Sequence, residues 1–142
     1  VPMTDREMSH LAKQLKPILV PELAVFAEHE GETVGFALAI PDLAVALRTN
    51  PSGRLFPGIL RVLLAARHLT RVRIIALGTL PEWRLKGVDA VLYHHIWQEG
   101  RKRGFDWGEA SWILETNVLM RNALERMGFV PYKTYRLYEK PL

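Results

Sequence analysis

An apolar strand that leads through a short basic loop into a helix most constrains how this chain can fold. The strand is expected over Arg71–Leu77, and the loop ends at Gly87, where the helix begins. Such a loop directs backbone N–H groups and the positive end of the helix dipole into one small space. Arg84 and Lys86 stand in the loop, so the segment predicts a binding site for a phosphate group.

The helix after this loop is expected to run from Val88 to about Gly100 and to be followed by a strand at Asp106–Leu114. A strand, a crossover helix and a second strand form a βαβ unit, so the two strands should be parallel. Helical spacing places several side chains on one face, namely Val88, Val91, Leu92, His95 and Glu99.

The residues before this unit predict a helix and a hairpin. Thr4 and Glu7 have the spacing of a capping box, and the helix that they begin should end before Pro17. Glu22–Glu28 and Thr33–Ile40 predict two antiparallel strands, and the apolar second strand is expected to be buried on both faces.

A loop and a helix are expected between the hairpin and the βαβ unit. Pro41–Gly58 is rich in turn residues and predicts a loop with one helical turn at Leu43–Leu47. The loop is followed by a helix at Ile59–His68. A loop of this length is often functional, so a role in acceptor binding and a role as an insertion without ligand contact both stay open.

The end of the chain predicts a helix and a closing strand. The helix should cover Asn117–Met127, with Asn117 as the N-cap and Gly128 in the C′ position. Tyr132–Glu139 alternates in polarity and predicts the strand.

Composition limits the class of protein. A chain of 142 residues predicts a single domain over 1–142 that folds without metals or disulfides, and there is no cysteine. The formal net charge of +4 fits an anionic ligand and equally fits weak attraction to nucleic acid. No apolar run approaches the roughly 20 residues that span a bilayer and no signal peptide precedes Val1, so we expect a cytoplasmic protein with no membrane partner and no specific nucleic-acid partner. The missing initiator methionine leaves open whether the chain is a fragment, a processed protein or a trimmed one.

Two landmarks resemble the GNAT superfamily of N-acetyltransferases. Pro81–Ala90 (PEWRLKGVDA) is similar to the family's pyrophosphate loop, and Asn117 stands eleven residues before Gly128-Phe129, as in the family's pattern. The hairpin sequence AEHEGETVGFALAIPD also resembles the family's hairpin, and the likeness extends from Leu23 to Glu139. It further suggests the C-terminal part of a longer bacterial acetyltransferase-like protein.

The resemblance implies an α/β fold of the α+β type: a mixed, mostly antiparallel sheet with a central parallel strand pair. It also implies acetyl-CoA as co-substrate and direct transfer of the acetyl group to a small-molecule or peptide amine, with a homodimer as an open alternative to a monomer. By the resemblance, the backbone after the strand lines the pantetheine, the basic loop holds the pyrophosphate and an asparagine contacts the pantetheine arm. The implied cofactor-binding residues are Ala76, Leu77, Gly78, Thr79, Leu80, Arg84, Leu85, Lys86, Gly87, Val88, Asp89, Ala90 and Asn117.

Two positions depart from the family. Asp89 places a carboxylate where the family has glycine or alanine, and Leu124 stands where many members have a tyrosine that acts as general acid. Acid–base candidates are therefore taken from elsewhere: Glu115 and Glu109 as general base, and Tyr132, with Tyr135 and Ser111 as alternatives, as proton donor. A catalytically weak acyl-CoA-binding sensor or partner domain is the alternative function. His94 and His95 are adjacent on a helix and do not form a metal-binding pair.

Overall fold

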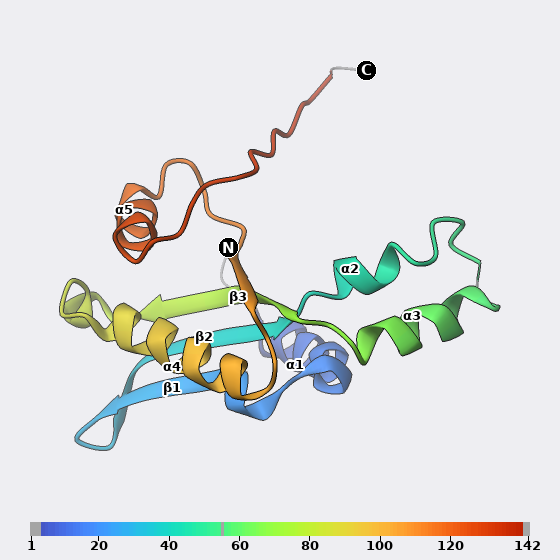
Figure 1. The fold of residues 1–142 in the computed structure, drawn as a ribbon. Helices are drawn as coiled ribbons and strands as arrows, with labels where there is room; N and C mark the ends of the chain where they lie inside the picture. The colour runs from blue at the N-terminus through green and yellow to red at the C-terminus, as the bar shows by residue number, and fades with distance from the viewer. Residues whose placement is uncertain (1–3, 55, 141–142) are drawn as a thin grey trace. The chain divides into compact units, whose positions relative to one another are not determined.

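The computed structural model describes residues 4–54 and 56–140. Contacts divide the chain into two compact units, 1–111 and 112–142, which are described separately below. Figure 1 shows the larger unit as a sheet with helices, coloured from blue to orange along the chain, and the smaller unit around α5 (Val118–Arg126) in orange and red.

The larger unit is organised around a four-stranded mixed sheet in the order β1-β2-β3-β4. Its strands are β1 (Ala24–His29), β2 (Glu32–Pro41), β3 (Arg71–Thr79) and β4 (Trp107–Ala110). β1 and β2 form the expected antiparallel hairpin, β2 pairs antiparallel with β3, and β3 pairs parallel with β4. The predicted α+β fold with a parallel strand pair is therefore confirmed.

Short helices precede and connect these strands. α1 (Asp5–Leu15) begins with the expected capping box, in which the backbone N–H of Thr4 donates to Glu7 Oε2 at 2.8 Å. The 3-10 turns η1 (Lys16–Ile18) and η2 (Pro21–Leu23) each begin near a proline and lead into β1. The expected loop contains α2 (Leu43–Leu47), and α3 (Gly58–Ala66) follows it.

The crossover helix α4 (Val88–Lys102) packs on one face of the sheet against β1, β2 and β3 (Figure 1). Leu92, Tyr93 and Ile96 are its buried large side chains. They meet a sheet core that includes Val34, Ala37 and Ala39 of β2, together with Leu23 of η2. The buried face of α4 therefore differs from the face predicted from helical spacing, since Val91 and His95 are both exposed.

Three predictions about strands were wrong. β2 is not buried on both faces, because Phe36 is exposed beside its β1 partner Phe26. The strand expected at 106–114 ends at Ala110. Tyr132–Glu139 forms no strand: within the described part of the smaller unit, α5 is the regular element, so the alternating side chains have no neighbouring strand there. The parallel pair consequently lies at one edge of the described sheet.

The packing of α4 makes a quantitative prediction. Leu92 is 1% exposed, so Leu92→Ala should lower the free energy of unfolding by about 3 kcal/mol through lost burial and a cavity. Val91 precedes it on the same helix and is 65% exposed, so Val91→Ala should change stability by less than about 0.5 kcal/mol. Urea unfolding followed by circular dichroism measures both. Equal losses in the two variants would contradict the observed orientation of α4.

Candidate functional site

The segment between β3 and α4 has the backbone of an anion-binding loop. The 3-10 turn η3 (Pro81–Trp83) comes first, and two left-handed residues follow it, Leu85 with φ 61° and Gly87 with φ 83°. Gly87 is the N-cap of α4, where no side chain caps the helix. The backbone N–H groups of the first helical turn are therefore open to an external acceptor, at the positive end of the helix dipole.

Contacts with the hairpin hold this loop in place. The N–H of Leu80 donates to the carbonyl of Val34 at 2.9 Å, and the Trp83 ring packs against His29 at a tilt of 54°, with ring centroids 4.6 Å apart. A β-carbon at Gly35 would lie only 3.0 Å from Cγ1 of Val88, so a glycine here lets α4 begin directly over β2. The loop and the N-terminus of α4 are thus held against the β1–β2 hairpin.

The two cations of the loop are accessible. Arg84 and Lys86 are exposed, and the Lys86 ammonium lies 4.7 Å from the centroid of the Trp83 ring. The loop therefore combines two positive side chains with free backbone donors, which is the chemistry that a diphosphate requires.

β3 is paired differently on its two sides. It pairs with β2 up to Thr79, whereas the ladder with β4 ends at Ile74 and Ala110. One further hydrogen bond joins the N–H of Ser111 to the carbonyl of Ile74 at 3.3 Å. Among the described residues, the second half of β3 therefore has a sheet edge without a strand partner, and this edge leads directly to the basic loop.

Asp89 lies in the first turn of α4, one turn before Tyr93. Burial, and after it the charge of Asp89, raise the pKa of Tyr93 from its ordinary value near 10 to about 12. The Asp89 carboxylate is thus close enough to Tyr93 for its charge to act on a buried phenol. Asp89 is only partly exposed, whereas Arg84 and Lys86 of the loop are exposed.

The structure places Glu109 in a buried ion cluster that sequence reasoning missed. Arg73 Nη2 lies 3.3 Å from Asp42 Oδ1 and 3.5 Å from Glu109 Oε1, and both carboxylates are less than a tenth exposed. Asp42 also caps α2 by accepting from the N–H of Ala44 at 3.2 Å. The cluster ties together the ends of β2, β3 and β4, so the position of Glu109 favours a structural role over that of a general base. The sequence carried one signal of this cluster, namely arginine alternating with valine in an otherwise apolar strand.

The smaller unit carries the remaining candidate residues. Asn117 caps α5 as expected, accepting from the N–H of Met120 at 3.2 Å, and Gly128 has φ 87° after the helix. Leu124 is buried at the family's tyrosine position. Tyr132 is half exposed, with the Lys133 ammonium 4.8 Å from its ring centroid.

Glu115 belongs to the same unit and is held by Arg136. Arg136 donates to both carboxylate oxygens, at 2.8 and 3.3 Å. These hydrogen bonds, then the charge of Arg136 and that of Arg121, lower the pKa of Glu115. A lowered pKa keeps the carboxylate ionised but makes it a weaker base.

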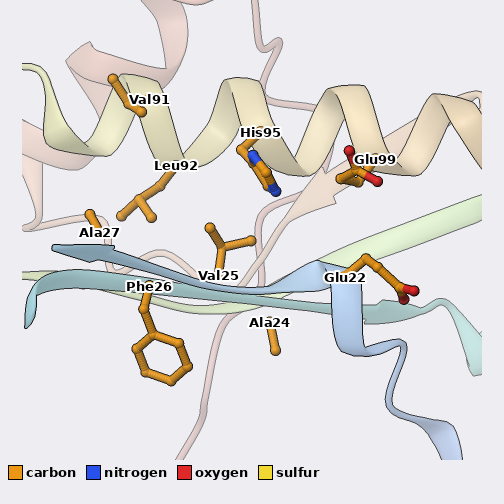
Figure 2. Close-up of a pocket in the computed structure, with 9 residues that line it drawn as sticks. All are labelled: Glu22, Ala24, Val25, Phe26, Ala27, Val91, Leu92, His95 and Glu99. Carbon is orange, nitrogen blue, oxygen red and sulfur yellow. The ribbon is translucent and has the colours of Figure 1, made fainter.

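A groove at the β1 edge was not expected from the sequence. It has a volume of about 510 Å³ and lies between β1 and α4 (Figure 2). Val25, Leu92 and His95 point into it, whereas Ala24 and Phe26 point to the other face of the sheet.

Within the residues that the structure describes, no cluster of histidine and carboxylate side chains could hold a metal ion. Nor does any described helix have the length and apolar character needed to cross a membrane.

The environment of Tyr93 predicts a spectroscopic signature. Neutral Tyr93 contributes stability below pH 10, and this contribution is lost as the pH rises through its folded-state value near 12. In an ultraviolet titration of the four tyrosines, Tyr93→Phe should remove a tyrosinate transition with a midpoint near 12. Asp89→Asn should lower this midpoint while leaving it raised, because burial is the larger cause. An unchanged midpoint in Asp89→Asn would show that the Asp89 charge does not reach Tyr93.

The chain is similar to known proteins in both sequence and structure, although no protein-family model matches it. It is 33% identical to protein YghO of Escherichia coli over 149 residues, which cover 100% of this chain and 38% of that protein. It is 31% identical to the bacterial ceramide synthase of Caulobacter vibrioides over 148 residues, which cover 99% of this chain and 38% of that protein. The chain thus spans less than two-fifths of the length of these two relatives.

Among solved structures, an aminoglycoside N-acetyltransferase, AAC(6')-Iy, bound to a bisubstrate analogue of coenzyme A superposes with a TM-score of 0.63. The match covers 99% of this chain and 82% of that structure at 18% sequence identity. Likeness at this identity establishes a shared fold. The mixed sheet, the parallel β3–β4 pair and the crossover helix α4 after a basic loop are the features expected of that fold. The chain therefore has the fold of the GNAT superfamily of acetyltransferases.

Proposed function

We propose that this chain is the acyl-CoA-binding domain of an N-acyltransferase. The observation that carries the proposal is the open N-terminus of α4, preceded by Arg84 and Lys86 and positioned at the end of β3. The pyrophosphate of coenzyme A binds the loop over Arg84–Ala90. The pantetheine arm runs along the unpaired edge of β3 at Ala76–Leu80. There the amide groups of the pantetheine pair with the β3 backbone in place of the missing strand.

The proposed chemistry is direct transfer. The acceptor amine attacks the thioester carbonyl, the carbon–sulfur bond breaks, and the amine proton leaves as the thiolate departs. Glu115 is the candidate that receives this proton, as an ionised carboxylate whose lowered pKa makes it a weak base. Tyr132 stays our candidate for protonating the thiolate, and Asn117 for contacting the pantetheine. Of the two candidate bases, we keep Glu115 and assign Glu109 to the buried ion cluster.

The acceptor that we propose is the primary amine of a long-chain amino alcohol. A ceramide is the N-acyl derivative of such an amine, and a relative named bacterial ceramide synthase is 31% identical over 99% of this chain. The aminoglycoside acetyltransferases support the fold at 18% identity and say less about the acceptor. The donor is an acyl-CoA, with acetyl-CoA as the form expected from the sequence. Cytoplasmic location and a homodimer stay predictions.

The loop assignment predicts a charge-dependent affinity. The double variant Arg84→Glu with Lys86→Glu should weaken coenzyme A binding roughly 100-fold, about 3 kcal/mol, through the loss of charge-assisted phosphate contacts. Isothermal titration calorimetry measures the affinity. The matched control is Arg101→Glu with Lys102→Glu, which makes the same charge change at the opposite end of α4. Equal weakening in both would mean that net charge, and not the loop, controls binding.

A second candidate function rests on Leu124, a buried side chain that cannot donate a proton where the family has its tyrosine. In that case the domain binds acyl-CoA without efficient turnover, as a sensor or partner domain. Release of free thiol from acetyl-CoA and from a long-chain acyl-CoA distinguishes the two functions. We expect release with sphinganine as acceptor, a reduced rate in Glu115→Gln, and none with kanamycin. Coenzyme A binding without thiol release from any amine would favour the sensor.

A further inference from the structure

The segment that contains α2 and α3 presents an uncovered apolar surface. In Figure 1 these helices, in teal and green, follow β2 and precede β3, and α3 packs against α2. Six large apolar side chains of the segment are between 50% and 81% exposed. They are Leu47, Phe56, Ile59, Leu60, Leu63 and Leu64, and we call them the α3 patch.

Most of the patch lies on one side of α3. Ile59 and Leu63, and likewise Leu60 and Leu64, are four residues apart, so their side chains follow one another along the same face of the helix. Val62 and Ala65 of the same helix are only partly exposed. α3 is therefore an amphipathic helix whose strongly apolar side faces outward, which is the reverse of a helix that packs on its own core.

The charge around the patch has a single sign. No aspartate or glutamate occurs between Asp42 and Glu82, although the chain holds 15 acidic residues. The same interval holds Arg48, Arg54, Arg61 and Arg67, all of them exposed. An apolar surface whose segment carries exposed arginines and no acidic residue fits a partner that offers hydrocarbon and negative charge together.

An anionic phospholipid surface meets both requirements. Its acyl region accepts the leucine, isoleucine and phenylalanine side chains, and its phosphates pair with the arginines. A patch of this kind is uncommon on a protein surface that stays in water. Arginine also binds phosphate in two-pronged geometry, which favours a lipid headgroup over a merely apolar contact.

We propose that the α3 patch and the arginines Arg48, Arg54, Arg61 and Arg67 dock this protein on the surface of an anionic bilayer, with α3 lying in the interface. This inference rests on the proposed function for its purpose: a long-chain amine is a membrane-resident substrate, so a docked enzyme meets its acceptor at the lipid surface. It replaces the expectation from sequence that no membrane is a partner. A surface-bound helix needs no span of the bilayer.

Co-sedimentation of the full-length protein with lipid vesicles tests the proposal. The protein should bind vesicles of phosphatidylglycerol and phosphatidylcholine, bind pure phosphatidylcholine at least roughly tenfold more weakly, and lose affinity in high salt. Leu60→Gln with Leu63→Gln should reduce binding roughly tenfold or more, because two apolar side chains that would enter the lipid are lost. The control is Trp97→Gln, an exposed apolar side chain on α4, which should bind as the parent does.

Two results would overturn the docking surface: no binding to anionic vesicles, and an equal loss of vesicle binding in the α3 double variant and in Trp97→Gln. Coenzyme A affinity, measured on the same samples, separates the two proposals. Vesicle binding without coenzyme A binding would sink the proposed function and leave the docking surface standing.

Discussion

The hydrogen-bond ladder between β3 and β4 ends at Ile74 and Ala110, while β3 itself continues to Thr79. The rest of the site depends on this difference. Because β2 pairs with β3 along the second half, that half stays extended even though its other edge has no strand partner among the described residues. Peptide groups held in this way form a preformed surface for an extended ligand.

The same strand fixes the basic loop. η3 leaves the end of β3 at once, and the close approach of Gly35 to Val88 sets the first turn of α4 over β2. The buried cluster of Arg73, Asp42 and Glu109 holds the opposite end of β3 against its neighbours. A rigid strand therefore connects a structural ion cluster at one end with an anion site at the other. Binding to such a site requires little ordering of the protein, which favours affinity.

Local signals made much of the fold predictable from the sequence. The Thr4 capping box, the β1–β2 hairpin and the Asn117 N-cap each depend on residues only a few positions apart. Features that depend on distant partners were missed. The Arg73 cluster joins three separate strands and a helix, and alternation at 132–139 could not reveal that no strand lies beside it in its unit. The outward face of α3 has the spacing of a core-facing helix, so periodicity alone could not show that this face is exposed.

Binding of an anion by the N-terminus of α4 is the central claim, and nuclear magnetic resonance tests it most directly. In a titration with coenzyme A, followed by backbone amide shifts, the largest changes should occur at Leu85, Gly87 and Val88, whose N–H groups surround the proposed pyrophosphate. Amides at Arg101 and Lys102, at the other end of the helix, should stay in place. Saturating shifts elsewhere, with the amides of the loop unmoved, would contradict the account.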